Sequence, residues 1–264
     1  MPTPEEGSHH LDDRAALRLS VRNAAAFWAA VARTRGHELV QRPGLLAVVG
    51  DERAGIRVLI LDRSPDQGVR ATIDELLTDH SELPVVVEDQ FATLTLEHHG
   101  LVKKRLPVMV RDESAGPTAV HPSAIIVDAV DSTEQLRVAE SIVVHGFDLP
   151  RMQPYQPGEA FPDDLLWYPG VRLFVAHHDG QPAGACLTVN EGTCAGIYWV
   201  TTLPEHRSVG VGRAIMRAAL AHLAPLPASL TATPAGEPLY TSAGFRRVAD
   251  ASWWSRSADV RLPS

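Results

Sequence analysis

The apolar positions along the chain follow two different spacings, and their order predicts an α/β unit in the N-terminal half. Residues 17–35 are alanine-rich, and their apolar positions recur at helical spacing up to a glycine at position 36. Short apolar runs with strand character follow, interrupted by a helical stretch. The predicted strands are 45–49, 56–61, 85–87 and 106–110, and the second helix is 71–80.

A second unit repeats this alternation. A strand at 124–130 precedes a helix that opens on a capping-type sequence at 131–134 and runs to about residue 144. Three strands joined by short turns then lead to another helix. The remaining predicted elements are strands at 171–178, 183–189 and 194–202, a helix at 209–223, a strand at 229–233, a short helix at 237–243 and a strand at 246–255.

A shift of 144 residues relates the two units. The order of elements agrees, and the shift superimposes an arginine and two glycines: Arg63 on Arg207, Gly68 on Gly212, and Gly100 on Gly244. We interpret this as an internal repeat. Because few side chains are identical, an unrelated small α/β module is the alternative interpretation of the first unit.

Changes in composition set the predicted domain boundaries. Residues 1–15 are polar and acidic and predict a flexible tail, while 113–122 are rich in proline and glycine and predict a linker. We therefore expect an N-terminal domain at 16–112, a second domain at 123–257, and a tail at 258–264.

Composition excludes several classes of function. The chain of 264 residues has 24 basic and 32 acidic side chains, and its net charge of −8 argues against a general nucleic-acid binder. Two cysteines exclude a disulfide scaffold. No apolar run approaches the ~20 residues that span a bilayer, and the N-terminus lacks the apolar core of a signal peptide. Adjacent histidines chelate poorly, so we expect no metal. We expect a cytoplasmic monomer or homodimer without nucleic-acid or membrane partners.

The segment that ends the strand at 194–202 and opens the next helix carries the clearest chemistry. It reads Arg207-Ser208-Val209-Gly210-Val211-Gly212-Arg213. Glycines let the backbone approach a ligand closely, and the unsatisfied N–H groups of a first helical turn bind anions. The segment therefore predicts a pyrophosphate site. It lacks the Lys-Ser/Thr of a P-loop and the third glycine of a dinucleotide fingerprint. An ordinary strand-to-helix turn is the alternative.

About 30 residues later the chain reads Pro238-Leu239-Tyr240-Thr241-Ser242-Ala243-Gly244-Phe245. The loop and this segment, in this order, resemble the GNAT superfamily of N-acetyltransferases over roughly 123–257. The resemblance implies the GNAT-type acyl-CoA N-acyltransferase fold, a central, mostly antiparallel twisted sheet flanked by helices, here preceded by a smaller related α/β half. It implies acetyl-CoA as co-substrate, an amine-bearing acceptor (a small molecule or a peptide), and direct transfer in a ternary complex.

The resemblance also implies a role for each matching residue. The strand before the loop is expected to hold the pantetheine arm and the acetyl carbonyl, and the loop is expected to hold the pyrophosphate. Tyr240 matches the tyrosine that protonates the departing thiolate, a role that a nearby phenol suits chemically. The alternative is that Tyr240 is a half-buried residue that only packs under the short helix. The implied cofactor-binding residues are Val200, Thr201, Thr202, Arg207, Ser208, Val209, Gly210, Val211, Gly212, Arg213 and Thr233.

Two positions depart from the family's pattern. Thr233 stands where many members have an asparagine, and it contacts the cofactor or only caps the short helix. Gly196 stands where many members have a glutamate that acts as the base. Glu191, Glu205, His206 or a chain of water molecules are substitutes, and none is singled out. The missing glutamate leaves a non-catalytic acyl-CoA-binding protein as an alternative, and a cofactor-free interaction protein is a third. Residues 147–168 are expected to line the acceptor cleft.

The first unit lacks the features that would bind a cofactor. At the shifted positions, Pro65 removes a backbone N–H, Asp66 replaces Gly210, and Leu96 replaces Tyr240. We therefore predict a degenerate GNAT-like half that binds no cofactor and supports the fold or shapes the acceptor cleft.

Overall fold

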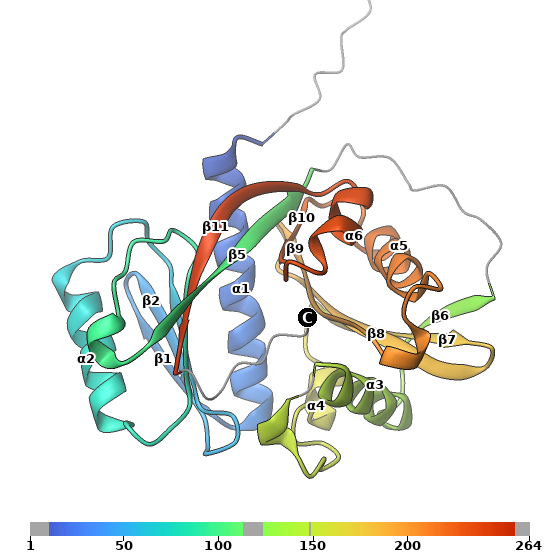
Figure 1. Cartoon of the computed structure of the whole chain (residues 1–264), viewed down its shortest axis with the longest axis horizontal. Coiled ribbons are helices and arrows are strands. Elements are labelled where there is room, and N and C mark those ends of the chain that lie inside the picture. Colours follow the sequence, from blue (N-terminus) through green and yellow to red (C-terminus); the bar gives the residue numbers. More distant parts are fainter. Residues whose placement is uncertain (1–10, 113–123, 148, 257–264) are drawn as a thin grey trace, which may run out of the picture.

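The computed structural model describes residues 11–112, 124–147 and 149–256, and it contains one mixed sheet of eleven strands (Figure 1). The predicted linker at 113–122 and the tail at 258–264 lie outside these residues. The strands are β1 (Glu38–Arg42), β2 (Leu45–Val49), β3 (Ile56–Ile60), β4 (Val85–Asp89), β5 (Val102–Arg111), β6 (Ile125–Ala129), β7 (Val171–His178), β8 (Gln181–Asn190), β9 (Ala195–Thr202), β10 (Ala228–Thr231) and β11 (Arg246–Ser255).

The helices flank this sheet, which confirms the predicted α/β class. They are α1 (Asp13–Arg35), α2 (Gln67–Asp79), α3 (Thr133–Gly146), α4 (Asp163–Leu166), α5 (Val211–Leu223) and α6 (Glu237–Ser242), with 3-10 turns η1 (Glu97–His99), η2 (Pro150–Met152) and η3 (Pro204–His206). The helix α1 begins within the segment predicted as a tail, because the Asp12 side chain accepts a hydrogen bond from the backbone N–H of Ala15. No helix in the described ranges is both long enough and apolar enough to cross a membrane.

Alternation along the strands divides the core between the two faces of the sheet. On β2, Leu46 and Val48 pack with α1, whereas Leu45 and Ala47 pack with α2. The same division holds in the other half, where α3 shares a core with α1 and α5 packs on the opposite face. The helix α1 contacts strands of both halves, from β1 and β2 in the first half to β8 and β9 in the second.

The last strands of the two halves are exchanged. The sheet order is β1-β2-β3-β4-β11-β5-β10-β9-β8-β7-β6, so β5 of the first half pairs with β10 and β11 of the second half pairs with β4. The two exchanged strands also pair with each other along the middle of the molecule (Figure 1). The predicted domains at 16–112 and 123–257 thus share one sheet.

The structure contains the internal repeat that the sequence predicts. A shift of 144 residues carries α2 onto α5 and β5 onto β11, matching both ends of each element. Most strand pairs are antiparallel, as expected, and the two parallel pairs, β3 with β4 and β9 with β10, occupy equivalent places in the two halves. The sequence did not predict which strands the last strands would join.

Candidate functional site

A bulge bends β9 at the centre of the second half. Opposite β8, Ala185 pairs with Thr201 and Leu187 pairs with Tyr198, so β9 carries one extra residue in this interval. Trp199 accommodates it with a φ of 51°, which is unusual for a residue with a large side chain. The bulge turns β9 away from the plane that it shares with β8.

The bend opens a wedge between β9 and β10. These strands are parallel and pair only at Ala228 with Ala195 and at Ser229 with Gly196. Beyond those pairs they diverge, and within the described ranges no strand pairs with their facing edges there. Backbone N–H and C=O groups on such edges are available to hydrogen-bond an extended ligand.

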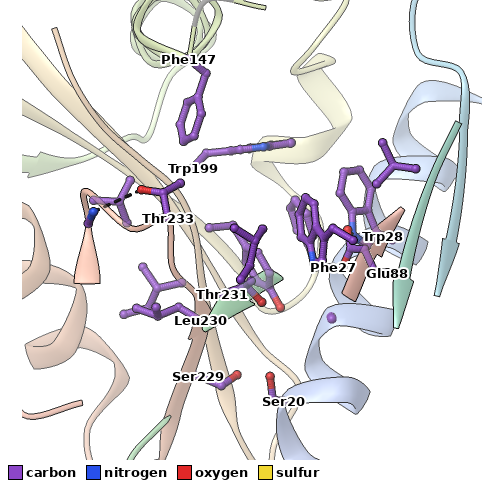
Figure 2. Close-up of a pocket in the computed structure, with 18 of the residues that line it drawn as sticks. Ser20, Phe27, Trp28, Glu88, Phe147, Trp199, Ser229, Leu230, Thr231 and Thr233 are labelled. Atoms are coloured by element: carbon purple, nitrogen blue, oxygen red, sulfur yellow. Dashed lines mark hydrogen bonds between the residues drawn. The ribbon is translucent and has the colours of Figure 1, made fainter. Parts of the chain in front are cut away.

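A cavity of about 310 Å³ fills the wedge and continues to the first half of the chain. Strand β9 contributes Trp199 and Thr202 to its lining, and α1 contributes Phe27 and Trp28. Figure 2 shows Trp28 and Glu88 on one side of this space and Thr233 on the other. Other residues that line the cavity include Arg57, Val86, Gln90, Phe147, Arg151, Tyr198, Val200, Leu239, Tyr240 and Trp253.

The first turn of α5 is open. Gly210 precedes it with a φ of 102°, and no side chain of the described residues caps it. The first turn of the equivalent helix α2 is capped, because the Asp66 side chain accepts a hydrogen bond of 2.8 Å from the backbone N–H of Val69. Unsatisfied N–H groups and the positive end of the helix dipole make an open first turn a site for an anion.

Some of the predicted cofactor-binding residues line the cavity or lie on the loop beside it. Val200, Thr202 and Thr233 line the cavity. The loop from Arg207 to Gly212 lies beside it, since a Cβ on Gly212 would stand 3.1 Å from Leu239 and 3.7 Å from the Thr202 hydroxyl, and both residues line the cavity.

Other predicted residues face elsewhere. Thr201 is buried with its methyl group against Gly146 of α3, so its side chain points away from the wedge. Val211 is buried in the core beneath α5. Val209 is half exposed, and Arg213 is exposed with a guanidinium nitrogen next to Gly210.

Tyr240 lies where the short helix α6 meets the cavity. Its side chain is 9% exposed, and its ring packs against Gly236 and near Phe245. Burial raises the pKa of the phenol well above its ordinary value, so the group stays protonated at neutral pH. Thr233 accepts a hydrogen bond of 3.2 Å from the backbone N–H of Gly236, so it supports the approach to α6 while also lining the cavity.

The structure explains why a glycine occupies position 196. A Cβ there would overlap the Asn23 Oδ1 of α1 and the ring of Tyr198. Asn23 is buried, donates to the carbonyl oxygens of Val189 and Cys194, and accepts from the Tyr198 hydroxyl. A carboxylate at position 196 has no room.

The residues named as substitutes for that carboxylate stand outside the cavity. Glu191 forms an ion pair with Arg22 and accepts from the backbone N–H of Cys194. His206 is within hydrogen-bond distance of His178, 3.3 Å between their Nδ1 atoms. Glu205 lines a separate surface hollow beside α3.

A buried ion pair in the cavity was not predicted. Glu88 Oε1 accepts from Arg57 at 2.6 Å and from the Trp28 indole at 3.1 Å. The Arg57 guanidinium stacks over the Trp28 ring at 4.1 Å and lies 5.3 Å from the Trp253 ring. The sequence of β4 has three valines followed by two adjacent acidic residues, so no alternation singles out Glu88, and only the fold shows that its face of β4 meets the cavity of the other half.

The expected acceptor-lining segment contributes only its first part. Phe147, Leu149, Pro150 and Arg151 line the cavity. Further along, Asp163 pairs with Arg137 in another hollow that Asp164 also lines, so these two acidic residues do not face this cavity.

Away from the cavity, Asp74, His98 and His99 bring ligand-type atoms within 4.8 Å of one another, and Asp74 and His99 are hydrogen-bonded.

Comparisons with known proteins agree with this geometry. Residues 169–247 match the family model described as an acetyltransferase (GNAT) domain. No curated protein sequence matches the chain significantly.

Several solved structures share the fold over most of the chain. A GCN5-related N-acetyltransferase from Kribbella flavida is 18% identical with a TM-score of 0.64, covering 89% of this chain and 95% of its own. One from Sphaerobacter thermophilus is 16% identical with a TM-score of 0.56, covering 94% and 95%. A tandem GNAT protein from the clavulanic acid biosynthesis pathway is 15% identical with a TM-score of 0.54, covering 95% and 98%.

Proposed function

We propose that this protein transfers an acetyl group from acetyl-CoA to an amine, because residues 169–247 match the family model of a GNAT acetyltransferase domain and the chain shares its fold with a tandem GNAT protein. The observation that carries the proposal is the wedge between β9 and β10, which begins beside the uncapped first turn of α5. A long, thin ligand with an anionic group at one end matches a wedge that has an anion site at its mouth.

Each part of acetyl-CoA has a suitable partner in this arrangement. The pyrophosphate would lie on the loop from Arg207 to Gly212, with Arg213 adding positive charge. The pantetheine arm carries amide groups, which would pair with the unpartnered backbone of β9 and β10. The thioester would then lie near the bulge at Trp199, inside the cavity.

The proposed reaction is a direct attack of a neutral amine on the thioester carbonyl. Backbone N–H groups near Val200 would stabilise the oxyanion of the tetrahedral intermediate. When the carbon–sulfur bond breaks, Tyr240 would donate its proton to the thiolate. Burial raises the pKa of Cys194 to about 11 and that of Cys186 further, so neither thiol is ionised at neutral pH, which supports transfer without a covalent enzyme intermediate.

The test of the cofactor site is Gly210→Asp. An aspartate there would place a carboxylate at the uncapped first turn of α5, at the repeat position that Asp66 occupies before α2. We expect the affinity for acetyl-CoA, measured by calorimetry, to fall about tenfold or more, equivalent to about 1.4 kcal/mol. The matched control is Gly180→Asp, because Gly180 also has a positive φ of 75° but lies in the turn between β7 and β8 with open space around it.

Equal affinity in Gly210→Asp and Gly180→Asp would show that the loop is not the cofactor site.

The absence of a carboxylate on β9 favours one second candidate, a non-catalytic acyl-CoA-binding protein. Detection of free CoA with a thiol reagent separates the two functions. Acetyl-CoA binding without turnover on any amine of a broad panel would support the binding protein.

A further inference from the structure

One carboxylate faces the cavity, and it comes from the first half of the chain. Among the lining residues that the structure describes, Glu88 is the only acidic side chain and none is a histidine. Side chains two apart on a strand share a face, so Val86, Glu88 and Gln90 all point into the cavity. Asp89 between them points away and accepts from the backbone N–H groups of the loop that follows β4.

The hydrogen bonds of Glu88 leave half of its carboxylate unused. Both bonds, from Arg57 and from Trp28, go to Oε1, and Oε2 accepts none from the described part of the chain. The side chain is only 5% exposed. Gln90 is 4% exposed, and its Oε1 is likewise buried without a partner among the described residues. Two oxygen atoms at this end of the cavity therefore lack donors, and an ammonium group supplies three.

We propose that Glu88 is the general base of the reaction, so that the half of the chain without a cofactor site supplies a catalytic residue to the other half. The inference depends on the proposed acetyl transfer. It places the acceptor amine in the cavity between the two halves, with its nitrogen in contact with Glu88 Oε2 directly or through one water molecule.

The surroundings of Glu88 suit a base. Burial raises the pKa of its carboxyl group, and the Arg57 ion pair opposes that rise. The other titratable groups that face it are Arg151, whose charge acts on Arg57, and the Tyr198 phenol, whose pKa is raised by burial. The lining residues of α1 carry no titratable group. A carboxylate whose pKa lies above its ordinary range accepts a proton from an amine more readily than an exposed one.

The proton balance is complete without another reactant. The acceptor enters as an ammonium ion and loses one proton to Glu88, and the neutral nitrogen forms a bond to the acetyl carbon. The carbon–sulfur bond then breaks, and the thiolate takes the proton of Tyr240. The new amide nitrogen loses its second proton, which returns the phenol to its neutral form through solvent, and Glu88 releases its proton to solvent.

The test is Glu88→Gln, which keeps an oxygen that accepts from Arg57 and Trp28. Its matched control is Glu97→Gln, which removes an exposed carboxylate of the same half outside the cavity. Release of free CoA is measured with phenylethylamine, which is protonated at neutral pH, with aniline, which is already neutral, and with water as the acceptor. Acetyl-CoA affinity is measured by calorimetry to verify that each variant is folded.

We expect Glu88→Gln to lower kcat with phenylethylamine by about 100-fold or more and to remove the limb of the pH profile that reports the carboxyl group. The decrease in kcat with aniline should be smaller, because aniline has no ammonium proton to lose. Acetyl-CoA affinity should not change. Glu88→Asp, which keeps the charge and shortens the side chain, should retain the pH limb with a lower rate, even if the glutamine variant is unstable.

Two results would overturn the assignment while leaving acetyl transfer intact. One is an equal loss of rate on phenylethylamine and aniline. The other is a rise in KM for the amine with an unchanged kcat and pH profile, which would make Glu88 an anchor for the acceptor. A wild-type protein that binds acetyl-CoA but releases CoA with neither of these amines nor any other amine of the broad panel would instead refute the proposed function, and the role of Glu88 with it.

Discussion

At the scale of single residues, one side chain decides whether a helix end is available to a ligand. Asp66 and Gly210 stand at equivalent positions of the repeat and precede helices of equal length. The aspartate satisfies a backbone N–H of its own helix, and the glycine leaves the first turn unsatisfied. The comparison within one chain supports the assignment of the cofactor to the second half alone.

The role of Tyr240 is tested by Tyr240→Phe. We expect kcat to fall by about 100-fold with little change in acetyl-CoA affinity, because the phenyl ring keeps the packing while the proton donor is lost. Initial rates across the pH range are the measurement. The control is Tyr168→Phe, whose hydroxyl accepts only from Arg33 among the described residues and lies outside the cavity. Equal rates in wild type and Tyr240→Phe at every pH would remove the assignment.

At the scale of elements, the docking of α1 on the turn between β8 and β9 holds the two halves in register. Asn23 makes three hydrogen bonds there: two buried ones to backbone carbonyls and one, partly buried, from the Tyr198 hydroxyl. Phe27, one turn further along, stacks on the Tyr198 ring at 3.9 Å between centroids. These contacts fix both α1 and the strand that bends into the cavity.

Asn23→Ala should therefore destabilise the protein strongly. It removes two hydrogen bonds to buried backbone carbonyls and the acceptor of the Tyr198 phenol, and we expect a loss of about 2–4 kcal/mol in the free energy of unfolding. Chemical denaturation followed by tryptophan fluorescence is the measurement. Asn190→Ala, which removes an exposed turn contact to Gly192, should cost less than about 1 kcal/mol. Similar losses in the two variants would contradict the role of Asn23.

The positions of the elements could be predicted from the sequence, but the partners of the strands could not. Hydrophobic period and turn residues locate a strand or a helix, so β7, the α5 loop and the repeat were predictable from local pattern. The partner of a strand is not a local property, because β5 and β11 would satisfy the same pattern beside either half. Glu88 was missed for that reason. It directly follows the apolar run predicted as a strand at 85–87, and its place in the cavity depends on α1 and on the exchanged strands.

At the scale of the whole molecule, the exchanged strands make each half incomplete alone. All five residues of β4 are buried, and β11 covers one of its edges. We expect a fragment of residues 1–112 to lack cooperative thermal unfolding by circular dichroism, because β4 and β5 would both lose strand partners. Mixing it with a fragment of 123–264 should restore the native spectrum and acetyl-CoA binding. A cooperative transition in the isolated 1–112 fragment would contradict this prediction.

The place of β11 has a consequence for biosynthesis. This strand is made after every other strand, yet it lies in the middle of the sheet, between β4 and β5. Multidomain chains commonly finish their N-terminal domain while the ribosome is still translating the next one. Here that route is closed, because one edge of β4 in the nascent first half has no partner until β11 has been synthesised and has left the ribosome. Chaperone demand during translation, more than thermal stability afterwards, should therefore govern the yield of this protein in a cell.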